Sequence, residues 1–110
     1  MIETLLKYKV TEAENGQVAI DKLKKGDITF DLVLVDLYMP EKDGIQVLNY
    51  IMQQDSLKNI PVIMMSADND VKNIAACLKL GAKNYLIKPI KPAFLQKQIK
   101  DNIKETIKAD

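Results

Sequence analysis

The sequence predicts an α/β fold in which a parallel sheet is covered by helices on both faces. Two apolar runs, residues 32–35 and 60–65, have the length of strands and lack the polar alternation of a sheet with one solvated face. Residues 71–78 repeat apolar side chains at the spacing of a helix face. Strands that alternate with such helices imply βαβ units, which build a parallel sheet.

The elements follow from the pattern of apolar residues and from the residues that interrupt it. Residues 1–7 are typical of the end of a helix, and the alternation over residues 8–13 predicts a short strand. Asn15-Gly16 is typical of a turn, and a helix is predicted over residues 17–25. The further expected elements are strands 32–35, 60–65 and 84–87, and helices that begin after Gly44, near Asp70 and before Leu95.

Composition limits the functions that this chain can have. Its 110 residues fit one domain, and 47% hydrophobic residues are enough for one core. Lys and Arg number 16 against 15 Asp and Glu, a balance that favours neither a nucleic-acid nor a membrane partner. Without histidine, Ser-His and Cys-His catalysis are excluded, and the lone Cys77 is expected to be a small helix residue. We expect a cytoplasmic protein that is not an enzyme.

Three side chains that can handle phosphate follow the ends of successive predicted strands. Asp36, Ser66 and Lys88 should meet at one edge of the sheet, because the carboxyl ends of neighbouring parallel strands lie side by side. Ligands of such sheets bind outside these carboxyl ends. A carboxylate can attack phosphorus, and an ammonium can neutralise a phosphoryl group. Taken singly, each residue has an ordinary explanation: a turn or cap for Asp36, a helix cap for Ser66 and a solvated surface residue for Lys88. The joint placement favours chemistry.

The sequence around these residues resembles the response-regulator receiver domain family. Asp36-Leu-Tyr-Met-Pro-Glu-Lys-Asp-Gly is similar to the segment that contains the phosphorylated aspartate of that family. Ser66-Ala67 and Lys88-Pro89 are similar to the ends of its fourth and fifth strands. The resemblance covers nearly the whole chain and implies a flavodoxin-like, doubly wound parallel sheet with strand order 2-1-3-4-5.

The resemblance assigns roles to particular residues. It implies that Asp36 accepts a phosphoryl group from a histidine kinase or a phosphotransfer protein, and that Ser66 and Lys88 bind that group. It implies that Tyr85 is an aromatic switch residue that changes rotamer with Ser66. It also implies a Mg²⁺ ion bound by Asp36 and by the backbone carbonyl of Tyr38, and a cis peptide between Lys88 and Pro89.

One part of the family pattern has no counterpart in the sequence. The family begins with a strand that ends in two acidic residues, which help to hold Mg²⁺. In residues 1–7, Glu3 is the only acidic residue. We therefore expect residues 1–110 to form one receiver-like domain, truncated at the N-terminus and lacking the first strand. Mg²⁺ binding should then be weak or absent, and the open sheet edge favours a homodimer or strand exchange.

Other functions remain to be weighed against a phosphorelay receiver. A degenerate receiver that is not phosphorylated and serves as a scaffold is the main alternative, and the missing acidic pair supports it. Residues 32–36 resemble a Walker B strand, but the chain has no Gly-x-x-x-x-Gly-Lys loop. A haloacid-dehalogenase-type phosphatase would need Asp at position 38, which is Tyr. No Gly-x-Gly-x-x-Gly motif supports a dinucleotide site.

Overall fold

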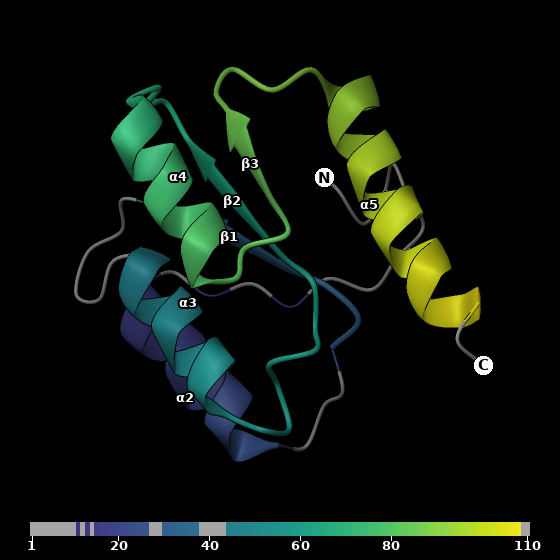
Figure 1. Cartoon of the computed structure of the whole chain (residues 1–110). Helices are drawn as coiled ribbons and strands as arrows, with labels where there is room; N and C mark the ends of the chain where they lie inside the picture. Colours follow the sequence, from purple (N-terminus) through teal and green to yellow (C-terminus); the bar gives the residue numbers. More distant parts are fainter. Residues whose placement is uncertain (1–10, 12, 14, 27–29, 38–43, 109–110) are drawn as a thin grey trace.

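A three-stranded parallel sheet organises the described part of the chain. The computed structural model describes residues 11, 13, 15–26, 30–37 and 44–108, with side chains described through residue 102. The strands stand in the order β1-β2-β3, and Figure 1 shows α2, α3 and α4 on one side of them and α5 on the other. The elements are α2 (Gly16–Lys25), β1 (Val33–Asp36), α3 (Gly44–Gln53), β2 (Val62–Ser66), α4 (Val71–Leu80), β3 (Asn84–Ile87) and α5 (Pro92–Lys108).

The central strand, β2, forms the floor of the core. Its residues Val62, Ile63 and Met64 are fully buried, as expected for a strand with helices on both faces. Burying each such side chain stabilises the fold by about 1.5–3 kcal/mol. The α3 residues Val47, Leu48 and Ile51 pack into the same cluster on one side of the sheet, with Cys77 of α4 and the α2 residues Ile20 and Leu23.

Parallel pairing aligns the carboxyl ends of the three strands. Asp36 is in register with Met65, and Ser66 is in register with Ile87. The pairing continues one residue past the strands: the Leu37 amide donates to the Met65 carbonyl at 2.9 Å, and the Lys88 amide donates to the Ser66 carbonyl at 2.8 Å. The ends of β1, β2 and β3 therefore form one continuous edge.

From residue 16 onward the predicted elements agree with these bounds within one or two residues, and two local details differ from the prediction. The strand expected over residues 60–65 begins at Val62. The Ile60 amide donates to the Leu57 carbonyl in the preceding turn, and Pro61 has no amide to donate. Asn15 and Gly16 do not form an isolated turn. Asn15 caps α2 by accepting a hydrogen bond from the Val18 amide at 2.9 Å, so the helix starts at Gly16.

Two further predictions concern the N-terminal part of the chain. Within the predicted strand over residues 8–13, Thr11 and Ala13 are described and belong to no strand, and the other positions lie outside the described residues. The helix end predicted over residues 1–7, including Glu3, also lies outside them. Among the described residues, none of the helices combines the length and the apolar character needed to cross a bilayer.

Candidate phosphoryl-acceptor site

Asp36 and Lys88 form an ion pair at the aligned strand ends. Lys88 Nζ donates to Asp36 Oδ2 at 2.5 Å, although the two residues are 52 positions apart in sequence. Both side chains are partly exposed, so a molecule arriving from solvent can reach the carboxylate. The predicted meeting of these two residues at one edge of the sheet is confirmed.

Ser66 is the last residue of β2 and lies between the strands that carry Asp36 and Lys88. It is only 1% exposed, and its Oγ accepts a hydrogen bond from the Asp68 amide at 3.0 Å. A serine hydroxyl has one proton and two lone pairs, so this bond leaves its proton available to an acceptor. We refer to Asp36, Ser66 and Lys88 as the strand-end cluster.

Tyr85 points into the protein beside Ser66. The residue is 8% exposed, and its hydroxyl donates to the Asp68 carbonyl at 2.8 Å. Burial raises the pKa of Tyr85, a side-chain hydrogen bond with Ser66 acts in the opposite direction, and the charge of Asp68 adds to the rise. Tyr85 is therefore a neutral hydrogen-bonding group at physiological pH, held between Ser66 and the loop that follows it.

Two features near this edge agree with smaller predictions. The peptide between Lys88 and Pro89 is cis, which confirms that prediction. Cys77 is fully buried in α4, as expected for a structural helix residue, and burial raises the pKa of its thiol, with a further contribution from Asp68.

Two residues beside the strand-end cluster, Asp68 and Gly44, were not predicted as site residues. Asp68 contacts both Ser66 and Tyr85, and its carboxylate accepts from the Asn73 side chain at 2.6 Å. The available signal was the Asp68-Asn69-Asp70 sequence before a helix, because Asp side chains often bond the backbone two residues ahead. Gly44 is the second case, since its amide donates to the Leu37 carbonyl at 2.8 Å directly beside Asp36.

The described residues do not by themselves fit a Mg²⁺ ion. This ion prefers six oxygen ligands, usually with one or two carboxylates among them. Within the part of the chain that the structure describes, no three Asp, Glu, Cys or His side chains gather where they could hold a metal. The Asp36 carboxylate is bound to the Lys88 ammonium, and Tyr38, the other predicted ligand, lies outside the described residues. No step is therefore assigned to a metal ion.

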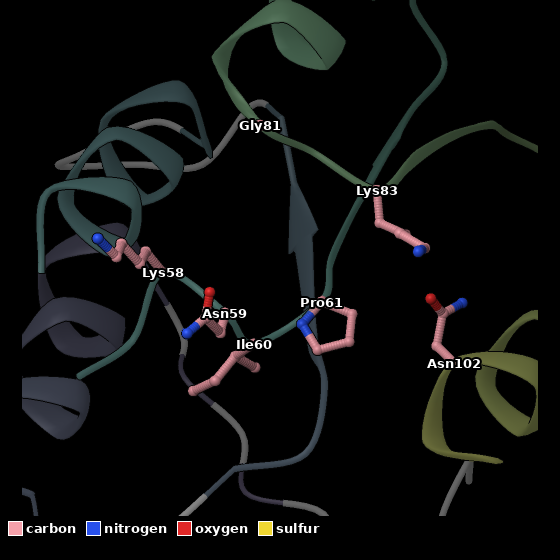
Figure 2. Close-up of a pocket in the computed structure, with 7 residues that line it drawn as sticks. All are labelled: Lys58, Asn59, Ile60, Pro61, Gly81, Lys83 and Asn102. Atoms are coloured by element: carbon pink, nitrogen blue, oxygen red, sulfur yellow. The ribbon is translucent and has the colours of Figure 1, made fainter. Parts of the chain in front are cut away.

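A cavity of about 310 Å³ lies at the opposite end of the sheet (Figure 2). Pro61 precedes β2 and Lys83 precedes β3, so the cavity opens at the amino ends of these strands, away from the strand-end cluster. Its lining consists of Lys58, Asn59, Ile60, Pro61, Gly81, Lys83 and Asn102. None of the predicted site residues is among them.

Comparison with known sequences agrees with this geometry. The family described as response regulator receiver domain matches residues 1–100. A two-component response regulator-like protein, PRR37 of Oryza sativa subsp. indica, is 44% identical over 84 residues, which is 76% of this chain and 11% of that protein. The two-component response regulator ORR3 of Oryza sativa subsp. japonica is 37% identical over 87 residues, 79% of this chain and 66% of the relative. The chain thus spans less than two thirds of the length of these relatives.

Solved structures show the same architecture. The receiver domain of Francisella response regulator 1452 superposes with a TM-score of 0.84 at 30% identity, covering 96% of this chain and 86% of that one. The receiver domain of the sensor histidine kinase PA1611 of Pseudomonas aeruginosa PAO1 gives a TM-score of 0.82 at 28% identity, covering 94% and 83%, and has a magnesium ion coordinated in its active site cleft. With the family match over residues 1–100 and an α/β fold shared with solved receiver domains, this chain belongs to the response regulator receiver domain family.

Proposed function

We propose that this chain is a signalling module that accepts a phosphoryl group on Asp36. The observation that carries the proposal is the Lys88 ammonium bound to the Asp36 carboxylate at the aligned strand ends. The donor would be a histidine kinase or a phosphotransfer protein, which presents the phosphoryl group on a histidine nitrogen. The modified chain would then bind its partners differently from the unmodified chain.

The transfer itself needs few groups. An Asp36 carboxylate oxygen would form a bond to phosphorus while the bond from phosphorus to the donor nitrogen breaks, and the electron pair of that bond stays on the imidazole. Lys88 would move its positive charge from the carboxylate to the incoming phosphoryl oxygens. Ser66 would donate its hydroxyl proton to one of those oxygens. Catalysis of this kind is largely positioning and charge stabilisation, and these residues would supply part of it.

The test is incubation with acetyl phosphate followed by intact-mass analysis. We expect a single phosphoryl adduct that is lost in Asp36→Asn and retained in Asp55→Asn, which removes a carboxylate that is 98% exposed. Formation should be slow, because the carboxylates among the described residues do not gather into a site for Mg²⁺. Lys88→Ala should slow it by about 10²–10³-fold, whereas Lys91→Ala should not.

Each result separates the proposal from its alternative. Absence of any adduct after long incubation would reject the phosphoryl-acceptor function and would favour a scaffold that uses the same fold without phosphorylation. Rapid modification that requires Mg²⁺ would show that carboxylates beyond the described residues, or from a second chain, complete a metal site. An adduct that persists in Asp36→Asn would place the acceptor elsewhere.

A further inference from the structure

Asp68 lies in the loop between β2 and α4 and connects the strand-end cluster to that helix. Its backbone binds one side: the amide donates to Ser66 Oγ at 3.0 Å, and the carbonyl accepts from the Tyr85 hydroxyl at 2.8 Å. Its carboxylate binds the other side: Oδ1 accepts from the Asp70 amide at 2.8 Å, and Oδ2 accepts from the Asn73 side-chain amide at 2.6 Å. One residue therefore touches both Ser66 and Tyr85 and the first turn of α4.

We propose that the Asp68 carboxylate and the Asn73 amide form a clasp that positions Ser66 and Tyr85. The clasp fixes the Asp68 backbone. The amide and carbonyl of that backbone then orient the Ser66 and Tyr85 hydroxyl groups, to which they are hydrogen-bonded. Asp68 and Asn73 are thus positioning residues that act through Ser66 and Tyr85. The consequence for signalling rests on the proposed function, in which Ser66 binds the phosphoryl group, but the clasp itself belongs to the unmodified chain.

The protons and lone pairs of the Ser66 and Tyr85 hydroxyl groups determine which further hydrogen bonds each can make. Tyr85 gives its proton to the Asp68 carbonyl, so its oxygen can only accept a further bond. Ser66 accepts from the Asp68 amide and keeps one proton to give. A phosphoryl group on Asp36 would attract that proton, because hydrogen bonds to a charged acceptor are stronger than those to a neutral one.

The clasp is separable from ordinary helix capping. Asp70 is the N-cap of α4: its Oδ1 accepts from the Lys72 amide at 2.9 Å, and its carbonyl accepts from the Ile74 amide at 3.0 Å. The start of the helix thus has a cap that does not involve the Asp68 carboxylate. Asp70→Ala consequently serves as a matched control, because it weakens the same helix start and leaves Asp68 and Asn73 in place.

The experiment measures Tyr85 in the unmodified protein by ¹⁹F NMR with 3-fluorotyrosine. The chain has four tyrosines, and Tyr85→Phe identifies the signal of Tyr85. Asn73→Asp places a second carboxylate against Asp68, so the Tyr85 signal should shift toward that of exposed fluorotyrosine and become sensitive to solvent. The double variant Asp68→Asn/Asn73→Asp restores an amide–carboxylate pair with the partners exchanged, and the signal should return. Asp70→Ala should leave it in place.

Several outcomes would overturn the clasp. These are an unchanged Tyr85 signal in Asn73→Asp, an equal shift in Asp70→Ala, or no recovery in the double variant. If circular dichroism shows that Asn73→Asp does not fold, Asn73→Ala removes the donor without adding charge, and the same shift is required of it. Because no phosphoryl donor is used, failure of Asp36 to accept a phosphoryl group would be seen only in the acetyl phosphate assay and would leave this result intact.

Discussion

Two kinds of side chain meet at the strand ends, and their burial separates their contributions. The Asp36–Lys88 ion pair is partly exposed, and pairs of this kind contribute about 0–1 kcal/mol to stability. Ser66 and Tyr85 are buried and hydrogen-bonded, so their loss would leave buried groups without partners. The charged pair is therefore available for chemistry at little cost to folding, while the neutral pair is part of the core.

Tyr85→Phe should change how stability depends on pH. Burial raises the pKa of Tyr85, so the folded protein keeps the phenol neutral while the unfolded chain begins to ionise at about pH 10. That contribution is fully present below about pH 10 and is lost as the pH rises through the higher folded value. Urea unfolding at pH 8 and pH 11 should show a smaller alkaline loss in Tyr85→Phe than in the native chain.

The same variant has a second expected effect and a control. At pH 8, Tyr85→Phe should be about 1 kcal/mol less stable, because the Asp68 carbonyl loses its hydrogen bond from the phenol. Ile51→Val changes a buried residue of α3 that has no ionisable group and is not part of this hydrogen-bonded group, and its alkaline loss should match that of the native chain. An alkaline loss in Tyr85→Phe as large as the native one would contradict the assignment.

For individual residues, the sequence predicted the position in space where the topology of the sheet alone determines it. Asp36 and Lys88 could be predicted to meet, because parallel strands bring successive carboxyl ends to one edge whatever the side chains are. Asp68 and Asn73 could not, because their contacts depend on the path of a short loop and on which way one carboxylate turns. Neither property has a periodic signature. Tyr85 was identified only through the family resemblance.

The end of β1 and the start of α3 make a close backbone contact beside Asp36. The start of α3 lies against the end of β1, and the Gly44 amide donates to the Leu37 carbonyl. A Cβ at Gly44 would lie 2.5 Å from the Asp36 carbonyl oxygen and 2.7 Å from Leu37 Cα. Because both neighbours are backbone atoms, the contact cannot be relieved by turning a side chain.

Gly44→Ala should therefore destabilise the protein by about 1–3 kcal/mol, as overpacking does, and should also displace Asp36. The effect on Asp36 should appear as slower adduct formation with acetyl phosphate. Gly26→Ala is the matched control: Gly26 has φ 71° at the end of α2, and an added Cβ would meet nothing closer than 3.8 Å. It should cost about 1–2 kcal/mol through its left-handed backbone and leave the adduct rate unchanged. Equal rates in the two variants would show that Gly44 does not position Asp36.

Element boundaries show where pattern reasoning loses accuracy. The strand over residues 84–87 agrees with β3, because its apolar residues end at the Lys88-Pro89 step. The beginning of β2 was placed too early because Ile60 is apolar, although its amide belongs to the preceding turn. Apolar character reports burial, whereas a strand begins where ladder hydrogen bonds begin, and the two can differ by a residue or two.

Among the described residues, the three-stranded sheet has two edge strands, β1 and β3. In the part of the chain that the structure describes, β1 pairs with β2 alone. A strand edge without a covering element is a surface on which another strand can add.

We expect the chain to self-associate through the edge of β1 that faces away from β2. Sedimentation velocity over a range of protein concentrations should show a monomer–dimer equilibrium. Lys substitution of Leu34, a half-buried residue in the middle of β1, should weaken association. Ile87→Lys, on the edge strand β3, provides the comparison for the other side of the sheet and should leave association unchanged. A monomer at every concentration would reject self-association, and equal loss in both variants would reject the β1 edge as the contact.

The ladder bonds just beyond β1 and β3 have a consequence for how the cluster can be observed. The Leu37 amide follows Asp36 directly, and the second amide is that of Lys88 itself. Both donate hydrogen bonds between strands, to the carbonyls of Met65 and Ser66. Such amides exchange with solvent deuterium only when the local structure opens. Their exchange rates thus read out whether the backbone around Asp36 and Lys88 opens separately or only with the rest of the sheet, without a label on any site residue.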